Sequence, residues 1–205
     1  DPIYLQDERF SRYGKLAPSS KADMAFVQHM LHQLDEQGTM AVVLPHGVLF
    51  RGGAEEAIRK YIIKDLNCLD AVIGLPANLF HGTGIPVCVL VLKSNRNGNS
   101  GNILFIDALK EFKPGKNQNI LEQEHIDKIV DAYEKRAEID KFAHKAYMSE
   151  IIENGYNLNI PRYVDTFEEE EPVDLDAVRN RIKTLDSETK AAIDKAESFM
   201  RELGL

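Results

Sequence analysis

Three short apolar segments rich in β-branched residues constrain the fold of this chain more than any other feature. Residues 40–44 run into Pro45-His46-Gly47, residues 69–75 come after a helical stretch, and residues 87–93 follow a loop between Phe80 and Pro86. This loop is too short for a crossover helix, so the strands on its two sides are predicted to be antiparallel. Helices that alternate with strands in this way indicate an α/β architecture.

Helical periodicity marks out the rest of the first half. Apolar residues recur at spacings of three and four over residues 24–34 and again over 54–66, which predicts two amphipathic helices. The continuous run 40–44 is typical of a strand that is covered on both faces. Residues 103–107 are predicted to form a last edge strand, so the sheet and its helices are expected to make up one domain over residues 1–110.

Residues 111–205 are predicted to be a mainly helical C-terminal region. One helix is expected at about 123–138, and the acidic run Glu168–Glu171 is interpreted as a solvated linker because like charges repel. A long helix over 174–203 has an apolar stripe with no obvious cover in its own chain. It either folds back onto the region after residue 120 or docks against another protein. The stripe contains Leu175, Val178, Ile182, Leu185, Ala192, Ala196, Phe199 and Leu203.

Composition limits the class of protein. A chain of 205 residues with 43% hydrophobic content can bury one sizeable core. Neither a membrane span nor a signal peptide fits, because the chain lacks a run of about 18 apolar residues and charged side chains are spread through its first twenty residues. A cytoplasmic protein is therefore expected. Cys68 and Cys88 are interpreted as reduced packing residues. His29 and His32 lie three apart, but a surface helix explains them better than a metal site.

The charge of the chain is uneven. The net charge is −8, with 13 Lys/Arg against 12 Asp/Glu in residues 1–120 and 12 against 21 in residues 121–205. A protein that binds nucleic acid through its phosphates usually presents a basic surface. The composition therefore argues against a DNA-binding protein that acts alone.

Four segments, in this order along the chain, carry a resemblance to a known family. They are residues 22–31 (Ala-Asp-Met-Ala-Phe-Val-Gln-His-Met-Leu), 42–51 (Val-Val-Leu-Pro-His-Gly-Val-Leu-Phe-Arg), 79–85 (Leu-Phe-His-Gly-Thr-Gly-Ile) and 156–163 (Tyr-Asn-Leu-Asn-Ile-Pro-Arg-Tyr). Together they resemble the modification, or methyltransferase, subunit of type I restriction-modification systems, over nearly the whole chain. The resemblance implies the C-terminal half of a Rossmann-like methyltransferase sheet followed by a helical C-terminal region. It further implies a DNA adenine-N6 methyltransferase that uses S-adenosylmethionine.

In that family a glycine-rich cofactor loop and an Asn-Pro-Pro-Phe/Tyr motif lie upstream of these segments. Neither occurs in this sequence. The Asn side chain and a Pro carbonyl of the motif accept the hydrogens of the adenine amine as charge develops during methyl transfer. The resemblance thus places the principal catalytic residues outside the chain. We expect no catalytic residue here, no S-adenosylmethionine bound by this chain alone, and no activity of the chain alone.

Phe80 is the one residue that the resemblance assigns to the target base. The base must leave the duplex before it can react, and stacking on an aromatic ring offsets part of that cost, which is a few kcal/mol. In related adenine methyltransferases a Phe just before the hairpin strand packs against the extruded base, and Phe80 matches that position. The alternative is an ordinary buried Phe at the end of a strand.

Further candidates flank the predicted strands. Pro45, His46 and Gly47 end a strand where open α/β sheets place ligands, and they form either part of a base-pocket wall or a plain turn. Arg51 and Arg59 are candidates for contacts with DNA phosphates, although such residues more often only solvate a helix. The last group of candidates either contacts a phosphate through its backbone amides or forms an ordinary turn. It consists of His81, Gly82, Thr83 and Gly84.

The resemblance also implies partners, namely DNA, the specificity and restriction subunits of the type I complex, and a second copy of the modification subunit, with no membrane. In the family, the C-terminal region helps to dock the modification subunit onto the specificity subunit. Two alternatives stay open. The chain is an interaction module that binds the specificity subunit through residues 174–203, or it belongs to a related single-chain adenine methyltransferase.

Overall fold

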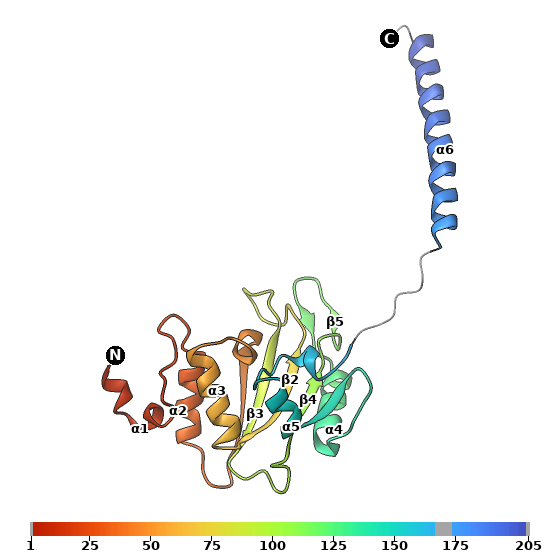
Figure 1. Ribbon diagram of the computed structural model, residues 1–205. Helices are drawn as coiled ribbons and strands as arrows, with labels where there is room; N and C mark the ends of the chain where they lie inside the picture. The colour runs from red at the N-terminus through yellow and green to blue at the C-terminus, as the bar shows by residue number, and fades with distance from the viewer. Residues whose placement is uncertain (1, 167–173, 204–205) are drawn as a thin grey trace. The chain divides into compact units, whose positions relative to one another are not determined.

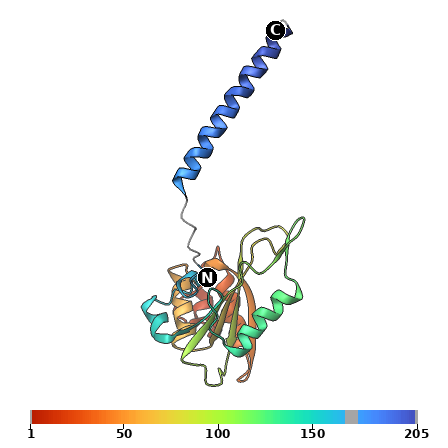
Figure 2. The ribbon, with the colours of Figure 1, turned by 90° about the vertical axis from the view of Figure 1, so that its right-hand side faces the viewer.

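The computed structural model describes residues 2–166 and 174–203, which belong to two compact units. The acidic run Glu168–Glu171 lies outside the described residues. The first unit is an α/β fold built on a mixed sheet, as predicted, and the described part of the second is one long helix (Figures 1 and 2). Within the described ranges, no helix is both long and apolar enough to cross a membrane.

The sheet of the first unit has the strand order β1, β3, β2, β4, β7. Both β1 and β2 run antiparallel to β3, which confirms the prediction made from the short loop between β2 and β3. β2 and β4 are parallel, and β7 is antiparallel to β4. In sheet order, the bounds of the strands are Thr39–Pro45, Val87–Lys93, Leu69–Leu75, Asn102–Asp107 and Ala143–Tyr147.

The sheet extends further along the chain than the sequence indicated. β4 is not an edge strand, because β7 pairs with it along the register from Asn102↔Tyr147 to Ile106↔Ala143. The predicted domain boundary near residue 110 is therefore wrong, and the first unit continues through the described residues up to 166. The sequence of β7 did not indicate a strand because it has only two small buried apolar side chains, Ala143 and Ala146.

β1 lies at the opposite edge of the sheet and is covered on one face only. Met40 and Leu44 are buried, whereas Ala41 and Val43 are exposed, Val43 by 50%. The expectation of a strand covered on both faces is wrong, because the helix on the second face, α4 (Gln123–Lys135), packs over β4.

Two hydrophobic clusters cover the two faces of the sheet. The larger one joins the strands to α2 (Asp23–His32), α3 (Ala54–Lys64) and α5 (Met148–Glu153), and the smaller one joins them to α4. Cys68 and Cys88 are free and lie in the larger cluster, where burial raises the pKa of Cys68 to about 11. Both are therefore buried packing residues. The remaining short elements are η1 (Pro2–Leu5), α1 (Glu8–Ser11), η2 (His46–Leu49), β5 (Lys113–Pro114), β6 (Asn119–Ile120) and η3 (Ile160–Arg162).

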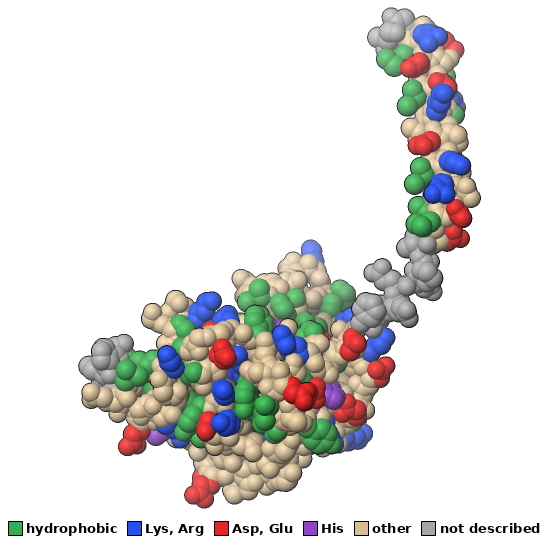
Figure 3. Space-filling model, viewed as in Figure 1, with side chains coloured by type: hydrophobic (Ala, Val, Ile, Leu, Met, Phe, Trp, Pro, Cys, Tyr) green, Lys and Arg blue, Asp and Glu red, His purple; other side chains and the backbone are tan. Residues whose placement is uncertain are grey.

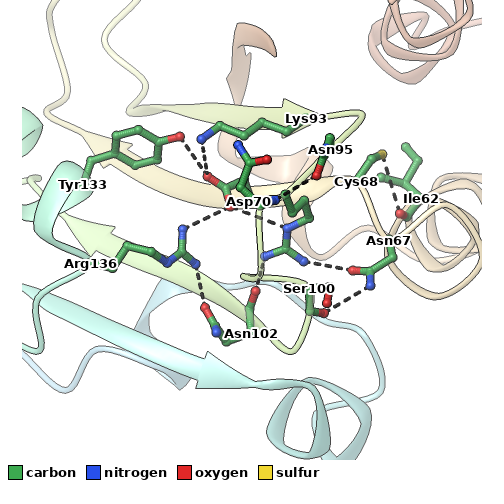
Figure 4. Close-up of polar contacts among 12 residues, drawn as sticks. Ile62, Asn67, Cys68, Asp70, Lys93, Asn95, Ser100, Asn102, Tyr133 and Arg136 are labelled. Atoms are coloured by element: carbon green, nitrogen blue, oxygen red, sulfur yellow. Dashed lines mark hydrogen bonds and ion pairs between the residues drawn. The ribbon is translucent and has the colours of Figure 1, made fainter. Parts of the chain in front are cut away.

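A buried ion network closes the end of the sheet at which β2 begins (Figure 4). Asp70 accepts hydrogen bonds from the Tyr133 hydroxyl at 2.8 Å and the Arg136 guanidinium at 3.0 Å, and Lys93 Nζ lies 3.3 Å away. Burial alone would raise the pKa of Asp70, but the Tyr133 bond and these two cations together lower it. Arg136, which takes φ +45° at the end of α4, also donates to Asn102 on β4 at 2.6 Å. The network ties α4 to β2, β3 and β4.

Helix α6 (Leu175–Glu202) makes up most of the described part of the second unit, as predicted. The Asp174 carboxylate caps it by accepting hydrogen bonds from the backbone N–H groups of Asp176 and Ala177. Apolar side chains follow one side of the helix (Figure 3), and the large ones are exposed. Positions on this side alternate at spacings of three and four, which is the repeat of a coiled-coil seam. They are Leu175, Val178, Ile182, Leu185, Thr189, Ala192, Ala196, Phe199 and Leu203.

Candidate functional site

The C-terminal ends of β1 and β2 and the start of β3 meet at one end of the sheet. Pro45 and Leu75 are both register partners of Val87, and Asp107 at the end of β4 pairs with Gly74. The turn after β1 and the loop 76–86 therefore lie at the same edge. Open α/β sheets place their ligands at such an edge.

Phe80 stands on loop 76–86, and its side chain is 46% exposed. An isolated bridge between Phe80 and Thr83 closes the loop into a tight turn, in which Gly82 takes φ +81°. Glycine adopts this conformation without the strain that a Cβ atom would add. An ordinary core Phe would be buried, whereas this one is held at the surface by a compact turn.

The loop shares a hollow with a hairpin that the sequence reading did not predict. β5 and β6 pair antiparallel as the hairpin 113–120, whose tip lies beside loop 76–86 at the same end of the sheet (Figures 1 and 2). The dipeptide Pro114-Gly115 was the available turn signal. The hollow measures about 270 Å³ and is lined by Asn78, Phe80, His81, Gly82, Thr83, Gly84, Asn117 and Gln118.

Three hydrogen bonds fasten the hairpin to the segment ahead of the exposed ring. The backbone N–H of Asn119 donates to the carbonyl of Asn78 at 2.8 Å, and its side-chain amide donates to the carbonyl of Ala77 at 2.9 Å. The Gln118 amide donates to the carbonyl of Leu79 at 3.3 Å. These bonds fix the hairpin relative to the loop.

His46, at the start of η2, is half-buried at this edge. Its Nε2 donates a hydrogen bond to the carbonyl oxygen of Val87 at 2.9 Å. Burial lowers the pKa of His46, so the ring is neutral at pH 7 and the Nε2–H tautomer satisfies the bond. Burial also raises the pKa of Asp107, whose carboxylate accepts a hydrogen bond from the backbone N–H of Leu109. The His46 ring thus joins the end of β1 to the start of β3.

Gly47 and Arg51 fit against each other. A Cβ atom at position 47 would lie 2.3 Å from Nη2 of Arg51, so glycine leaves the room that the guanidinium needs. Arg51 Nη1 pairs with Glu55 at 3.1 Å and with Asp23 at 3.4 Å. Two carboxylates of this chain therefore neutralise the charge that was expected to face DNA phosphates.

Arg59 is buried, which corrects the expectation of a surface phosphate contact. It is 4% exposed and donates to the carbonyls of Val48 at 3.1 Å, Arg51 at 3.0 Å and Tyr156 at 2.9 Å. Burial lowers the pKa of Arg59, but a guanidinium stays protonated in proteins. The side chain joins α3 to the turn after β1 and to a segment almost a hundred residues away, and that distant partner leaves no local pattern in the sequence.

The two histidines of α2 do not converge with further ligands. His29 Nδ1 lies 3.2 Å from Arg9 Nη1, a cation rather than a metal ligand. Within residues 2–166 and 174–203, no group of three His, Cys, Asp or Glu side chains is placed to hold a metal ion.

Comparison with known proteins identifies the family. The sequence profile of the N-6 DNA methylase family matches residues 1–172. The chain belongs to this family. It is 39% identical, over 97% of its length, to the type I restriction enzyme MpnII methylase subunit of Mycoplasma pneumoniae. It is also 38% identical, over 91% of its length, to the MjaVII methylase subunit of Methanocaldococcus jannaschii. These matches cover 36% and 33% of the relatives, so this N-6 DNA methylase chain spans about a third of their length.

Solved structures agree with this family and fold. The crystal structure of a type I restriction-modification methyltransferase subunit from Streptococcus thermophilus matches with a TM-score of 0.77 at 57% identity, covering 80% of this chain and 35% of that one. A structure from work on complex assembly in the type I restriction-modification system matches with a TM-score of 0.56 at 19% identity, which shows the fold alone. The resemblance to type I modification subunits is confirmed.

Proposed function

We propose that this chain is part of a type I restriction-modification subunit that transfers a methyl group from S-adenosylmethionine to adenine N6 in DNA. Within that subunit, it contributes the side of the active site that holds the target base. The observation that carries the proposal is the exposed Phe80 ring, on a loop braced by a hairpin at the ends of the strands. Core packing does not account for an aromatic ring that is held at the surface in this way. In a family of DNA methylases, stacking on the target base accounts for it.

The chemistry requires the base to leave the duplex, because its amine cannot be reached inside the stack. Phe80 stacks on the extruded ring, and such stacking contributes about 1–3 kcal/mol per base. Pro45, the neutral His46 and Gly47, which lie at the end of β1 on the same edge of the sheet, are assigned to the wall of the base pocket. The turn of His81, Gly82, Thr83 and Gly84 approaches the DNA backbone through its amides.

S-adenosylmethionine supplies the methyl group in this proposal. The hollow beside Phe80 does not fit the cofactor, because its lining contains no carboxylate that could accept hydrogen bonds from ribose hydroxyls. The cofactor site is therefore assigned to other parts of the subunit. The residues of this chain bind and orient the base.

Replacement of Phe80 in the complete subunit, assembled with its specificity subunit, tests the proposal. Phe80→Ala is expected to lower the fluorescence of 2-aminopurine at the target position and to reduce the methylation rate by about ten- to a hundredfold. Phe80→Tyr keeps the ring and should behave nearly as wild type. Phe26→Ala, at a Phe that is 65% exposed on α2, is the matched control. Wild-type fluorescence and rate in Phe80→Ala would contradict the proposal.

A second proposal concerns α6, which we infer docks the subunit onto the specificity subunit. The supporting observation is its seam of exposed apolar side chains at coiled-coil spacing. Burial of these side chains against partner helices supplies the driving force. DNA, the restriction subunit and a second copy of the modification subunit complete the proposed complex.

Deletion of residues 175–203 from the complete subunit is expected to abolish pull-down of the specificity subunit. The Phe80→Ala variant should dock as wild type does, which separates assembly from base capture. Unchanged binding after the deletion would overturn the docking proposal and leave the base-holding proposal in place.

A further inference from the structure

The hollow between loop 76–86 and hairpin 113–120 is rich in hydrogen-bond donors and contains no carboxylate. Its lining combines the amides of Asn78, Asn117 and Gln118 with the turn 80–84. Amide N–H groups, a Thr hydroxyl and main-chain N–H groups are all donors. The amides and the hydroxyl can also accept hydrogen bonds, but with donors available and no carboxylate in its lining the hollow accommodates an anion whose oxygens only accept.

Asn117 is a lining residue whose side chain has no evident role in holding the fold together. Gln118 and Asn119 use their amides to hold the hairpin against the loop. The carboxamide of Asn117 is exposed and, among the described residues, makes no hydrogen bond, although it lines the hollow. Lys116, also exposed, precedes it on the tip of the hairpin and adds positive charge.

The tip that carries Asn117 is tightly built. A Cβ atom on Gly115 would lie 2.3 Å from the carbonyl oxygen of Gln118, so glycine is needed for the tip to close. The three bonds to the segment 77–79 hold the tip beside Phe80. The amide and the ring therefore belong to one braced unit.

We infer that hairpin 113–120 is a phosphate clamp for the target strand. The Asn117 amide donates a hydrogen bond to a phosphodiester oxygen next to the nucleotide whose base stacks on Phe80. Extrusion of a base turns its nucleotide about the backbone, so a neighbouring phosphate that is held in place sets where the base arrives. Asn117 is thus a positioning residue. This inference rests on the proposed function, because it needs DNA at Phe80.

Replacement of single DNA phosphodiester linkages by uncharged ones tests the clamp in the complete subunit assembled with its specificity subunit. Duplexes that contain the target site carry one methylphosphonate linkage, moved in turn along the target strand on both sides of the adenine. The wild-type complex is expected to bind about three- to tenfold more weakly when one linkage next to that adenine is neutral. Asn117→Ala should show the same loss with native DNA and no further loss at that linkage.

The Asn117→Asp variant is the more decisive test of the clamp. A carboxylate at this position repels the phosphate, so native DNA should bind more weakly to Asn117→Asp than to Asn117→Ala, and the neutral linkage should restore part of the affinity. Gln33→Glu, the same change of charge at the exposed C-cap of α2, is the control and should keep the wild-type linkage profile. All variants are expected to melt within a degree or two of wild type, because neither the Asn117 nor the Gln33 side chain makes a hydrogen bond to another described residue.

The outcomes separate the two proposals. If Phe80→Ala impairs base extrusion but Asn117→Ala stays as sensitive as wild type at every linkage, the clamp is overturned and the proposed function stands. If the wild-type complex fails to methylate adenine, the proposed function itself fails. If Asn117→Ala keeps wild-type sensitivity at the linkages next to the target adenine and loses it only at a more distant one, the clamp as assigned is also rejected.

Discussion

Arg59 satisfies three carbonyls from segments that lie far apart in the sequence, at Val48, Arg51 and Tyr156. Arg59→Met keeps the apolar stem but leaves these acceptors without their donor. We expect the free energy of unfolding to fall by about 2–4 kcal/mol, since each unsatisfied buried group costs about 1–3 kcal/mol and relaxation recovers a part. Urea denaturation should show a lower midpoint with an unchanged slope.

Lys64→Met, at an exposed position of the same helix, is the control for this prediction and should change stability by less than about 0.5 kcal/mol. An Arg59→Met variant as stable as wild type would show that the three bonds are not needed.

His144 on β7 lies between two carboxylates, with Nδ1 against Glu138 and Nε2 at 3.0 Å from Glu150. Burial alone would lower the pKa of His144, but the bonds to Glu150 and Glu138 raise it above its ordinary value. The folded state therefore favours the imidazolium. Its stabilisation is fully present below the unfolded pKa of about 6.5 and is lost as pH rises through the folded pKa.

The His144→Gln variant should accordingly lose more unfolding free energy, relative to wild type, at pH 6 than at pH 9. The difference is expected to be about 1 kcal/mol or less, because the pairs are partly exposed. His32→Gln, at an exposed residue of α2, is the control. Equal losses at both pH values would mean that the charge of His144 does not contribute to the free energy of unfolding.

Single residues were predictable where a local pattern marked them. Phe80 could be picked out because the resemblance matches it to a Phe just before the hairpin strand, and the antiparallel pairing of β2 and β3 places it at the end of the sheet. The roles of Arg59 and Asn117 could not be predicted. The main-chain partners of Arg59 are distant in sequence, and Asn117 is placed by a hairpin that polar hydrogen bonds hold. Such contacts leave no hydrophobic periodicity.

Among the elements, β1 is the one whose surroundings matter most. It pairs with β3 on one side, and the described residues place no strand on its other side. An open strand edge presents N–H and C=O groups that can pair with another chain. We predict that this chain, when isolated, self-associates through β1.

Analytical ultracentrifugation at increasing protein concentration tests this prediction. Val43→Lys places a charge on the exposed face of the edge strand and should reduce association with little loss of stability, because Val43 is 50% exposed. A monomer at all concentrations would contradict the prediction.

Elements with strong periodicity could be read from the sequence. Helices α2, α3, α4 and α6 follow their apolar stripes, and the runs of β1, β2 and β3 mark the strands. β7 and the hairpin 113–120 could not be read in this way, because their few apolar residues are small or exposed. Tertiary pairing with β4 and with loop 76–86, rather than local preference, decides their structure.

At the scale of the whole molecule, the two ends of the sheet have different roles. The end at which β2 begins is closed by the Asp70 network and ties α4 to the strands. The opposite end carries the braced loop with its exposed ring and donor-rich hollow. The first unit thus offers one rigid edge to DNA in the proposed complex, and α6 offers a separate surface to a protein partner.

In the proposed function, this chain holds the wall for the target base and not the site of the methyl donor. Calorimetric titration of the isolated chain with S-adenosylmethionine tests the claim most directly, with the complete subunit as the binding control. We predict heat of binding for the complete subunit and none for the isolated chain. Tight, saturable binding of S-adenosylmethionine by the isolated chain would contradict it.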